Sequence, residues 1–184
     1  MLTDIKSLDA KPAEEDAIAL LLGCHQRIRH FTGVALRLAE NPEVGETKRA
    51  DAERAVLLYY TIALPLHEAD ENDSIYPRLR KKLPEGALAE ANEKMVAQHQ
   101  TIDALVAALV PQWQTIVDRP AEQDAFRSLL QQTRQLQNTW TSHLQMEEEQ
   151  VVPAMRQYLT VNDLEVIRNE MRARREHSGV PIQS

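Results

Sequence analysis

One pattern of three residue types occurs twice in this sequence, 76 positions apart. The segments HEADENDSIYP at 67–77 and HLQMEEEQVVP at 143–153 each contain a histidine, a glutamate four residues later and a proline six residues after the glutamate. A second pair of segments, CHQRI at 24–28 and QHQTI at 98–102, repeats with a similar offset of 74 residues. Two motifs that recur in the same order predict a duplicated structure made of two similar hairpins.

Long stretches with an apolar period near 3.6 residues lie between short segments rich in proline, glycine and helix-capping residues, so we predict helices throughout. Four long helices joined by short loops are expected to form an antiparallel up-down-up-down four-helix bundle, an all-α fold. We expect a single domain over residues 1–184, with the bundle at about 13–160, a short fifth C-terminal helix and a short tail. The predicted helices span about 13–40, 46–82, 87–117, 121–158 and 161–176. Proline lacks an N–H and clashes with the preceding turn, so kinks or helix ends are expected at Pro65, Pro77, Pro111 and Pro153.

The composition excludes several classes of partner. With 21 basic and 28 acidic side chains, the chain has a net charge of −7, whereas nucleic-acid binding requires clustered positive charge. The longest apolar run, AIALLLGC at 17–24, is much shorter than the roughly 20 residues that span a bilayer. The single cysteine, Cys24, cannot form an internal disulfide, and the first ten residues do not resemble a secretion signal. We therefore expect a cytoplasmic protein without a nucleic-acid or membrane partner, and the sequence indicates no particular protein partner.

The repeated histidines and glutamates form a set of candidate metal ligands. Residues four apart on a helix lie on one face, so His67 and Glu71 are expected to point the same way, as are their counterparts in the second copy. With one histidine from each shorter motif, the set has four imidazoles and two carboxylates. Such a set suits iron, manganese or zinc better than calcium or magnesium, which prefer oxygen ligands. The predicted metal ligands are His25, His67, Glu71, His99, His143 and Glu147.

Six ligands related by an approximate two-fold repeat predict two metal ions rather than one. Each ion would take two histidines, both carboxylates would bridge the ions, and a further oxo or hydroxo bridge would leave room for a small exogenous ligand. Two buried glutamates without a counter-ion would be costly, so two cations would also stabilise the fold. We therefore expect the metal-free protein to be less stable than the metal-bound protein.

The order of these motifs, a lone histidine followed by HxxxE in each half, resembles the hemerythrin-like, or HHE cation-binding, family over about residues 18–160. The resemblance implies a four-helix bundle that holds a non-haem di-iron centre, with the six residues given above at the ligand positions. It implies a protein that binds or senses a small ligand, namely dioxygen, nitric oxide or peroxide. A di-iron enzyme that reduces peroxide and an iron donor for iron–sulfur cluster repair are alternatives. The sequence leaves open whether the protein is an enzyme and whether the metal is zinc or manganese instead of iron. A metal-free interaction module is a third possible function.

Two positions differ from the pattern of the family. Oxygen-carrying hemerythrins have a fifth histidine on the third helix, whereas Met95 and Asp103 lie one turn on either side of His99 here. The loss of a nitrogen ligand argues against reversible oxygen carriage. Many bacterial relatives have a histidine where this chain has Glu68. Glu68 is rotated by about 100° from His67 around a helix, so we place it outside the ligand set.

Other chemically active residues are interpreted more simply. His30 has no counterpart in the repeat, because position 104 is alanine. We expect His30 to lie on the surface or to contact one of the metal-binding side chains without binding the metal itself. Asp70 is an alternative ligand, but its repeat partner is Met146, which cannot replace it. Cys24 is expected to be a small buried core residue rather than a redox thiol. Solvated charges are expected at Glu148, Glu149 and the basic run at 172–175.

Overall fold

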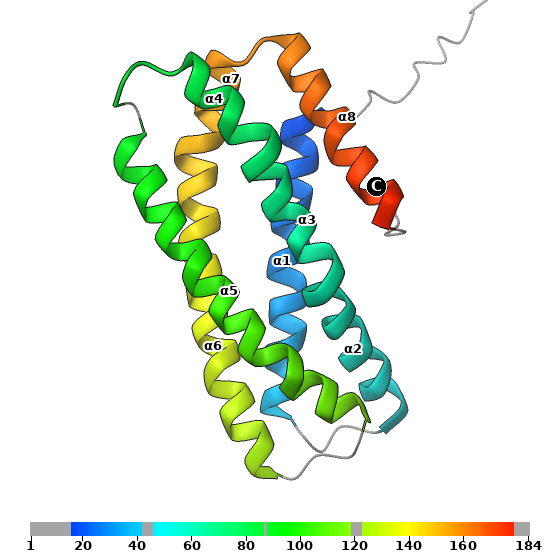
Figure 1. Cartoon of the computed structure of the whole chain (residues 1–184). Coiled ribbons are helices and arrows are strands. Elements are labelled where there is room, and N and C mark those ends of the chain that lie inside the picture. The colour runs from blue at the N-terminus through cyan, green and yellow to red at the C-terminus, as the bar shows by residue number, and fades with distance from the viewer. Residues whose placement is uncertain (1–15, 42–45, 87, 119–122, 179–184) are drawn as a thin grey trace, which may run out of the picture.

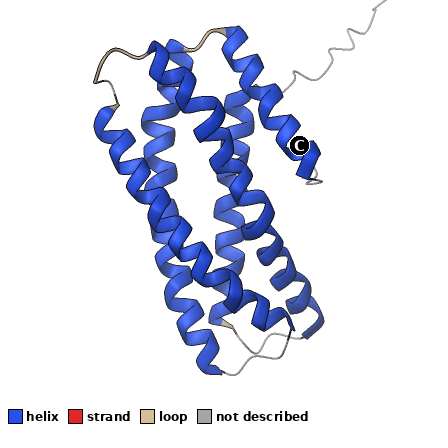
Figure 2. Cartoon of the chain, viewed as in Figure 1, coloured by secondary structure: helices blue, strands red, loops and turns tan. Residues whose placement is uncertain are grey.

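The fold, seen in a computed structural model, is described for residues 16–41, 46–86, 88–118 and 123–178, and within these ranges there is no β-strand (Figure 1, Figure 2). The predicted helix at 46–82 is one continuous helical column that changes type along its length. A second such column begins at residue 123 and ends at Tyr158. The elements are α1 (Ala17–Glu40), α2 (Glu46–Leu58), η1 (Tyr59–Ala63), α3 (Leu64–Ala69), η2 (Asp70–Ile75), α4 (Tyr76–Lys82), α5 (Ala89–Asp118), α6 (Gln123–Met146), η3 (Glu147–Val151), α7 (Val152–Tyr158) and α8 (Val161–Ser178).

These boundaries confirm the four long helices and the fifth, shorter one that the sequence predicts. The first helix begins one residue after Asp16, whose side chain accepts a hydrogen bond from the backbone N–H of Ala19 at 2.7 Å and so caps the helix. The predicted starts at 13, 87 and 121 lie outside the described residues, as does the tail after residue 178.

Four helical columns form an all-α, up-down-up-down bundle. Helix α1 contacts α2 and α6, and α5 contacts the same two helices from the opposite corner. The predicted fold class is therefore confirmed. Helix α8 lies outside the bundle, against α1, α3 and η2 (Figure 1).

Each of three prolines follows a π-helical turn instead of ending its helix. In a π-turn the backbone N–H bonds to the carbonyl five residues earlier rather than four. The N–H groups of Leu64, Tyr76 and Val152, each followed by a proline, bond in this way. Because the proline ring clashes with the carbonyl four residues before it, a wider turn relieves that clash. The sequence predicts a kink or a helix end at each proline; none of these three prolines ends its helical column, and Pro111 likewise lies inside α5. The three π-turns accept hydrogen bonds at the carbonyls of Tyr59, Glu71 and Glu147.

Two separate apolar clusters fill the bundle. One lies toward α4, α7 and α8 and includes Leu21, Ile75 and Met155. The other fills the opposite end and includes Ile28 and Trp113. Along each helical column, the histidines and glutamates of the repeated motifs occur where one cluster gives way to the other. The bundle therefore holds a buried polar layer between two apolar ones.

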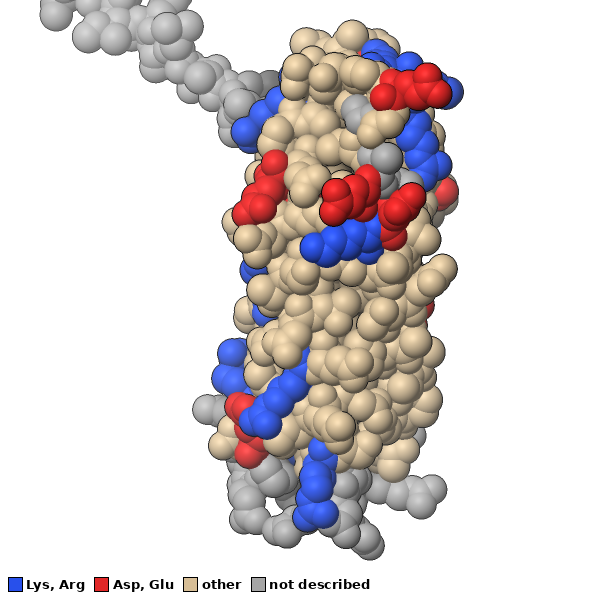
Figure 3. All heavy atoms as spheres, turned by 90° about the vertical axis from the view of Figure 1, so that its left-hand side faces the viewer, with Lys and Arg blue, Asp and Glu red and all other residues tan. Residues whose placement is uncertain are grey.

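The outer surface shows a different distribution of charge. On the face where α5 and α6 lie, charged side chains of both signs lie near the two ends, and the middle is largely uncharged (Figure 3). Among the described helices, none combines the length and apolar character that crossing a membrane requires.

Candidate metal centre

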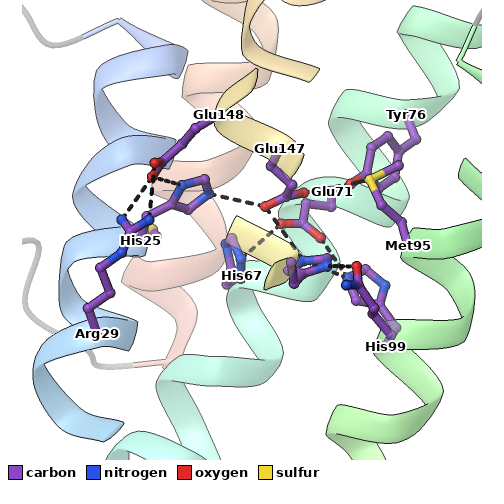
Figure 4. Close-up of polar contacts among 12 residues, drawn as sticks. His25, Arg29, His67, Glu71, Tyr76, Met95, His99, Glu147 and Glu148 are labelled. Atoms are coloured by element: carbon purple, nitrogen blue, oxygen red, sulfur yellow. Dashed lines mark hydrogen bonds and ion pairs between the residues drawn. The ribbon is translucent and has the colours of Figure 1, made fainter. Parts of the chain in front are cut away.

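The structure brings all six predicted ligands together in the buried polar layer. Figure 4 labels every one of them except His143. All four helical columns contribute to this layer, and the two glutamates both lie in π-turns. Five of the six residues are at most 1 % exposed, whereas the side chain of His99 is 13 % exposed. The contributing residues are His25 on α1, His67 on α3, Glu71 in η2, His99 on α5, His143 on α6 and Glu147 in η3.

The ligand atoms form two groups that share Glu71. One group is His25, His67, Glu71 and Glu147, and the other is Glu71, His99 and His143; within each, the atoms lie within 4.8 Å of one another. The two carboxylate oxygens of Glu71 face different histidines, with Oε1 at 2.8 Å from His67 Nε2 and Oε2 at 3.1 Å from His99 Nε2. This arrangement places Glu71 between two positions that could each hold one ion. Glu147 Oε2 lies 3.2 Å from His25 Nε2 and 3.6 Å from His143 Nε2, so it also approaches both groups.

His99 Nε2 and His143 Nε2 lie within hydrogen-bond distance of each other, at 3.2 Å, but most of the other converging atoms lack such a partner. The Nε2 atoms of His25 and His67, both oxygens of Glu71 and Oε2 of Glu147 are buried and lack a hydrogen-bond partner in favourable geometry. A buried acceptor without a partner costs about 1–3 kcal/mol, and more when it is charged. Cations bound between these atoms would satisfy all of them. The nitrogen and oxygen donors fit iron, manganese or zinc.

Without a cation, the carboxylates and imidazoles compensate one another. Burial by itself would lower the pKa of His67, but the charges of Glu71 and Glu147 raise it well above its usual value. Burial would raise the pKa of Glu71, but the adjacent His67 and His99 hold it well below its usual value. Burial and the positive charge of the other imidazoles lower the pKa of His143 to about 4. Metal binding would therefore compete with protonation of His67.

Two of the histidines are oriented by hydrogen bonds on the side that faces away from the centre. His25 Nδ1 lies 2.9 Å from Glu148 Oε1, and Arg29 donates to both oxygens of Glu148 at 2.8 and 3.0 Å (Figure 4). His143 Nδ1 lies 3.3 Å from Gln98 Oε1. In both contacts the acceptor oxygen fixes the proton on Nδ1, which leaves the Nε2 lone pair directed at the centre. The prediction that Glu148 is a solvated charge was wrong, because the side chain binds across to α1. Glu149 is exposed, as predicted.

We expect Glu148→Gln to weaken metal binding by about 10–100-fold, because partners that orient a metal-bound histidine typically contribute this much to affinity. Glutamine cannot provide the negative charge that polarises the His25 imidazole. Glu149→Gln is the matched control, since Glu149 lies next in the chain, is exposed and bonds only to Gln145 among the contacts described. Competition with a chelator of known affinity measures the metal affinity of both variants. Equal affinities would show that Glu148 does not support His25.

Tyr76 is a site residue that the sequence repeat does not reveal. The hydroxyl donates to Glu147 Oε1 at 2.6 Å and also lies 2.9 Å from the sulfur of Met95 (Figure 4). Burial and the charges of Glu71 and Glu147 raise the pKa of Tyr76 well above its usual value, so it stays a hydrogen-bond donor. The repeat partner of Tyr76 is a valine, so the only sequence signal is its place before Pro77.

Hydrogen bonds and ion pairs connect helix α8 to the π-turn that contains Glu71. The buried side chain of Asp70 accepts hydrogen bonds from Arg175 at 2.5 Å and from Arg174 at 3.0 Å, and Arg174 also donates to Ser74 at 2.8 Å. Asp70 thus faces α8 and belongs to neither group of converging donors. The prediction that residues 172–175 are solvated was wrong for these two arginines. Their partners lie about a hundred residues earlier in the chain, so a local pattern could not indicate them.

The remaining candidates lie around the centre. Cys24 is buried, as predicted, and its sulfur accepts contacts from Arg27 and Arg175, both at 3.2 Å. Burial raises the pKa of Cys24, but His67 and the two arginines together lower it to about 7. His30 is exposed, as predicted for a surface group. Glu68 is half-buried and belongs to neither group of converging donors.

The fold and the centre together define a helical bundle with a histidine and carboxylate site suited to two metal ions. A family model, the hemerythrin HHE cation-binding domain, matches residues 16–155, and the chain belongs to this family. The match covers α1 to the middle of α7 and includes all six converging residues. A search of curated proteins finds no match to this chain.

Proposed function

We propose that this protein holds a non-haem di-iron centre at the six converging residues and uses it to bind or sense dioxygen, nitric oxide or peroxide. The observation that carries the proposal is the pair of donor groups that share Glu71. Each group contains two histidines from different helices, so both positions have nitrogen ligands that stabilise iron. Two iron ions held there would supply open coordination positions and electrons for a small ligand.

The protein residues around the centre would prepare it for such a ligand. Glu148 and Gln98 hold the protons of two imidazoles on the outer nitrogens. Tyr76 occupies Oε1 of Glu147 and leaves Oε2 for the metal. The ring of Trp140 packs against His67 and His143, at centroid distances of 5.9 and 5.3 Å, and helps to exclude water. A low-dielectric site of this kind strengthens the interactions inside it.

An iron donor or a di-iron enzyme is the second candidate. The position between His99 and His143 lies beside the partly exposed side chain of His99, and an ion held there would have the shortest route to solvent. Oxygen-carrying hemerythrins have a fifth histidine on the third helix, whereas this chain has Met95 and Asp103 one turn on either side of His99. The position between His99 and His143 therefore has fewer nitrogen ligands. Both features favour release or turnover over stable oxygen carriage.

Metal content and an optical spectrum of anaerobically iron-reconstituted protein test the proposal. We expect two irons per chain and a change in the near-ultraviolet spectrum when nitric oxide, or separately air, is admitted. A stable adduct would support the binding or sensing function. Catalytic consumption of peroxide, or transfer of iron to an acceptor, would favour the second candidate. Fewer than about one iron per chain under these conditions would contradict both functions.

A further inference from the structure

The metal centre has one exposed edge. Among the six converging residues, only His99 reaches solvent to a measurable extent, with 13 % of its side chain exposed. Solvent therefore comes nearest to the six residues beside His99. On the α6 side of His99, the amide of Gln98 bonds to Ser142 at 3.1 Å and to the His143 ring at 3.3 Å, so side-chain contacts bridge α5 and α6 there. The side toward α3 remains.

A hollow of about 190 Å³ lies between η1, α3 and α5 on that side. A water molecule occupies about 30 Å³ in the liquid, so the hollow can admit a diatomic molecule, peroxide or a hydrated ion in part. Its walls include Tyr60, Leu64, Val106 and Ala107, and its polar part consists of Glu68 and Asp103. Glu68 follows His67 in the chain, and Asp103 is one helical turn beyond His99. The polar part of the hollow thus adjoins residues of both donor groups.

The two acidic residues place negative charge in this hollow. Glu68 makes a hydrogen bond with Asp103, which two carboxyl groups can do only when they share one proton, so the pair carries about one negative charge rather than two; Glu68 also interacts electrostatically with His99 and Glu71. The partly buried position of Glu68 reduces solvent screening, so a passing anion meets repulsion, whereas a neutral molecule does not. A divalent cation is attracted by the same charge.

We propose that the hollow between α3 and α5 is the entrance to the metal centre, and that Glu68 and Asp103 make it admit neutral molecules and divalent cations in preference to anions. This inference rests on the proposed function for its ligand class. It also applies to loading of the centre, since the metal must enter the same buried layer.

Rates of cobalt(II) uptake by the metal-free full chain test the entrance without iron chemistry. Ala107→Phe fills the hollow, so the ion can pass only after side chains move aside, and uptake is expected to be slower by about tenfold or more. Ala108→Phe is the matched control, because Ala108 is the next residue, is exposed on α5 and does not line the hollow. Equal uptake by wild type and Ala107→Phe, with normal final loading, would overturn the entrance and leave the metal centre intact. Absence of cobalt binding by the wild type would overturn the centre and the entrance together.

The charge preference is tested on the iron-loaded protein with two probes. In the double variant Glu68→Gln and Asp103→Asn, we expect azide, an anion, to associate about tenfold faster than in the wild type. Association of nitric oxide, which is neutral, is expected to stay unchanged. Acceleration of both probes would mean that the substitutions simply widen the route, and acceleration of neither would show that the acidic pair does not select the ligand. Either result would overturn the selective role.

Discussion

Glu71→Gln is expected to abolish binding of both metal ions, because Glu71 is the one carboxylate that belongs to both groups of converging donors. Each of its oxygens faces a histidine of a different group, and glutamine offers only one neutral oxygen. His99→Ala should remove one ion only, since His99 belongs to a single group. Metal content after reconstitution should therefore fall from two ions per chain to about none in the first variant and to about one in the second.

Thermal unfolding with and without metal provides an independent measure. A ligand present at about a hundred times its dissociation constant stabilises the folded state by about 2.7 kcal/mol, so the wild type should unfold at a higher temperature with metal. Glu71→Gln should lose this increase. Its metal-free form should remain folded, because glutamine keeps the side-chain volume and His67, which loses its charged partner, can release its proton and become neutral. Two ions per chain in Glu71→Gln would show that Glu71 does not bridge the groups.

The repeated motifs predicted the six converging residues because the relevant geometry is local. A histidine and a glutamate four residues apart share a helix face regardless of what surrounds the helix. The repeat then required the two halves to place their motifs in the same layer of the bundle. The π-turns refine this expectation, because Glu71 and Glu147 each accept the wider backbone bond that precedes a proline. The recurring proline in the motif is thus explained by backbone geometry.

The residues that support the centre could not be predicted in the same way. Glu148 reaches across to α1 and Tyr76 reaches across to Glu147, so their roles depend on the packing of separate helices. Helical periodicity records only whether a position faces inward. Arg175 in particular lies in a polar run that is typical of a solvated helix end, yet it is 8 % exposed. Its partner, Asp70, lies 105 residues earlier in the chain.

The buried contact between Arg175 and Asp70 predicts a large loss of stability when Arg175 is replaced. Arg175 lies 2.5 Å from Asp70, which is fully buried, and it also donates to the Met171 carbonyl at 2.7 Å. Arg175→Met keeps much of the apolar stem but leaves Asp70 with only Arg174, which is more exposed, as a counter-ion. Removing one partner of a buried ion pair typically costs about 3–5 kcal/mol. Unfolding in denaturant should show a loss of this size, with an unchanged dependence on denaturant concentration.

A double-mutant cycle separates the ion pair from other effects of the substitution. Asp70→Asn combined with Arg175→Met should be much more stable than Arg175→Met alone, because no buried carboxylate is left without its partner. Burial raises the pKa of Asp70, and the arginines oppose that rise, so the pKa should rise further in Arg175→Met. A carboxyl group with a raised pKa in the folded state destabilises the fold increasingly as pH rises above its ordinary value. The free energy of unfolding of Arg175→Met is expected to be lower than that of the double variant. This difference should therefore shrink as pH falls and Asp70 becomes protonated. A difference that is independent of pH would attribute the loss to packing of α8 instead of to the buried charge.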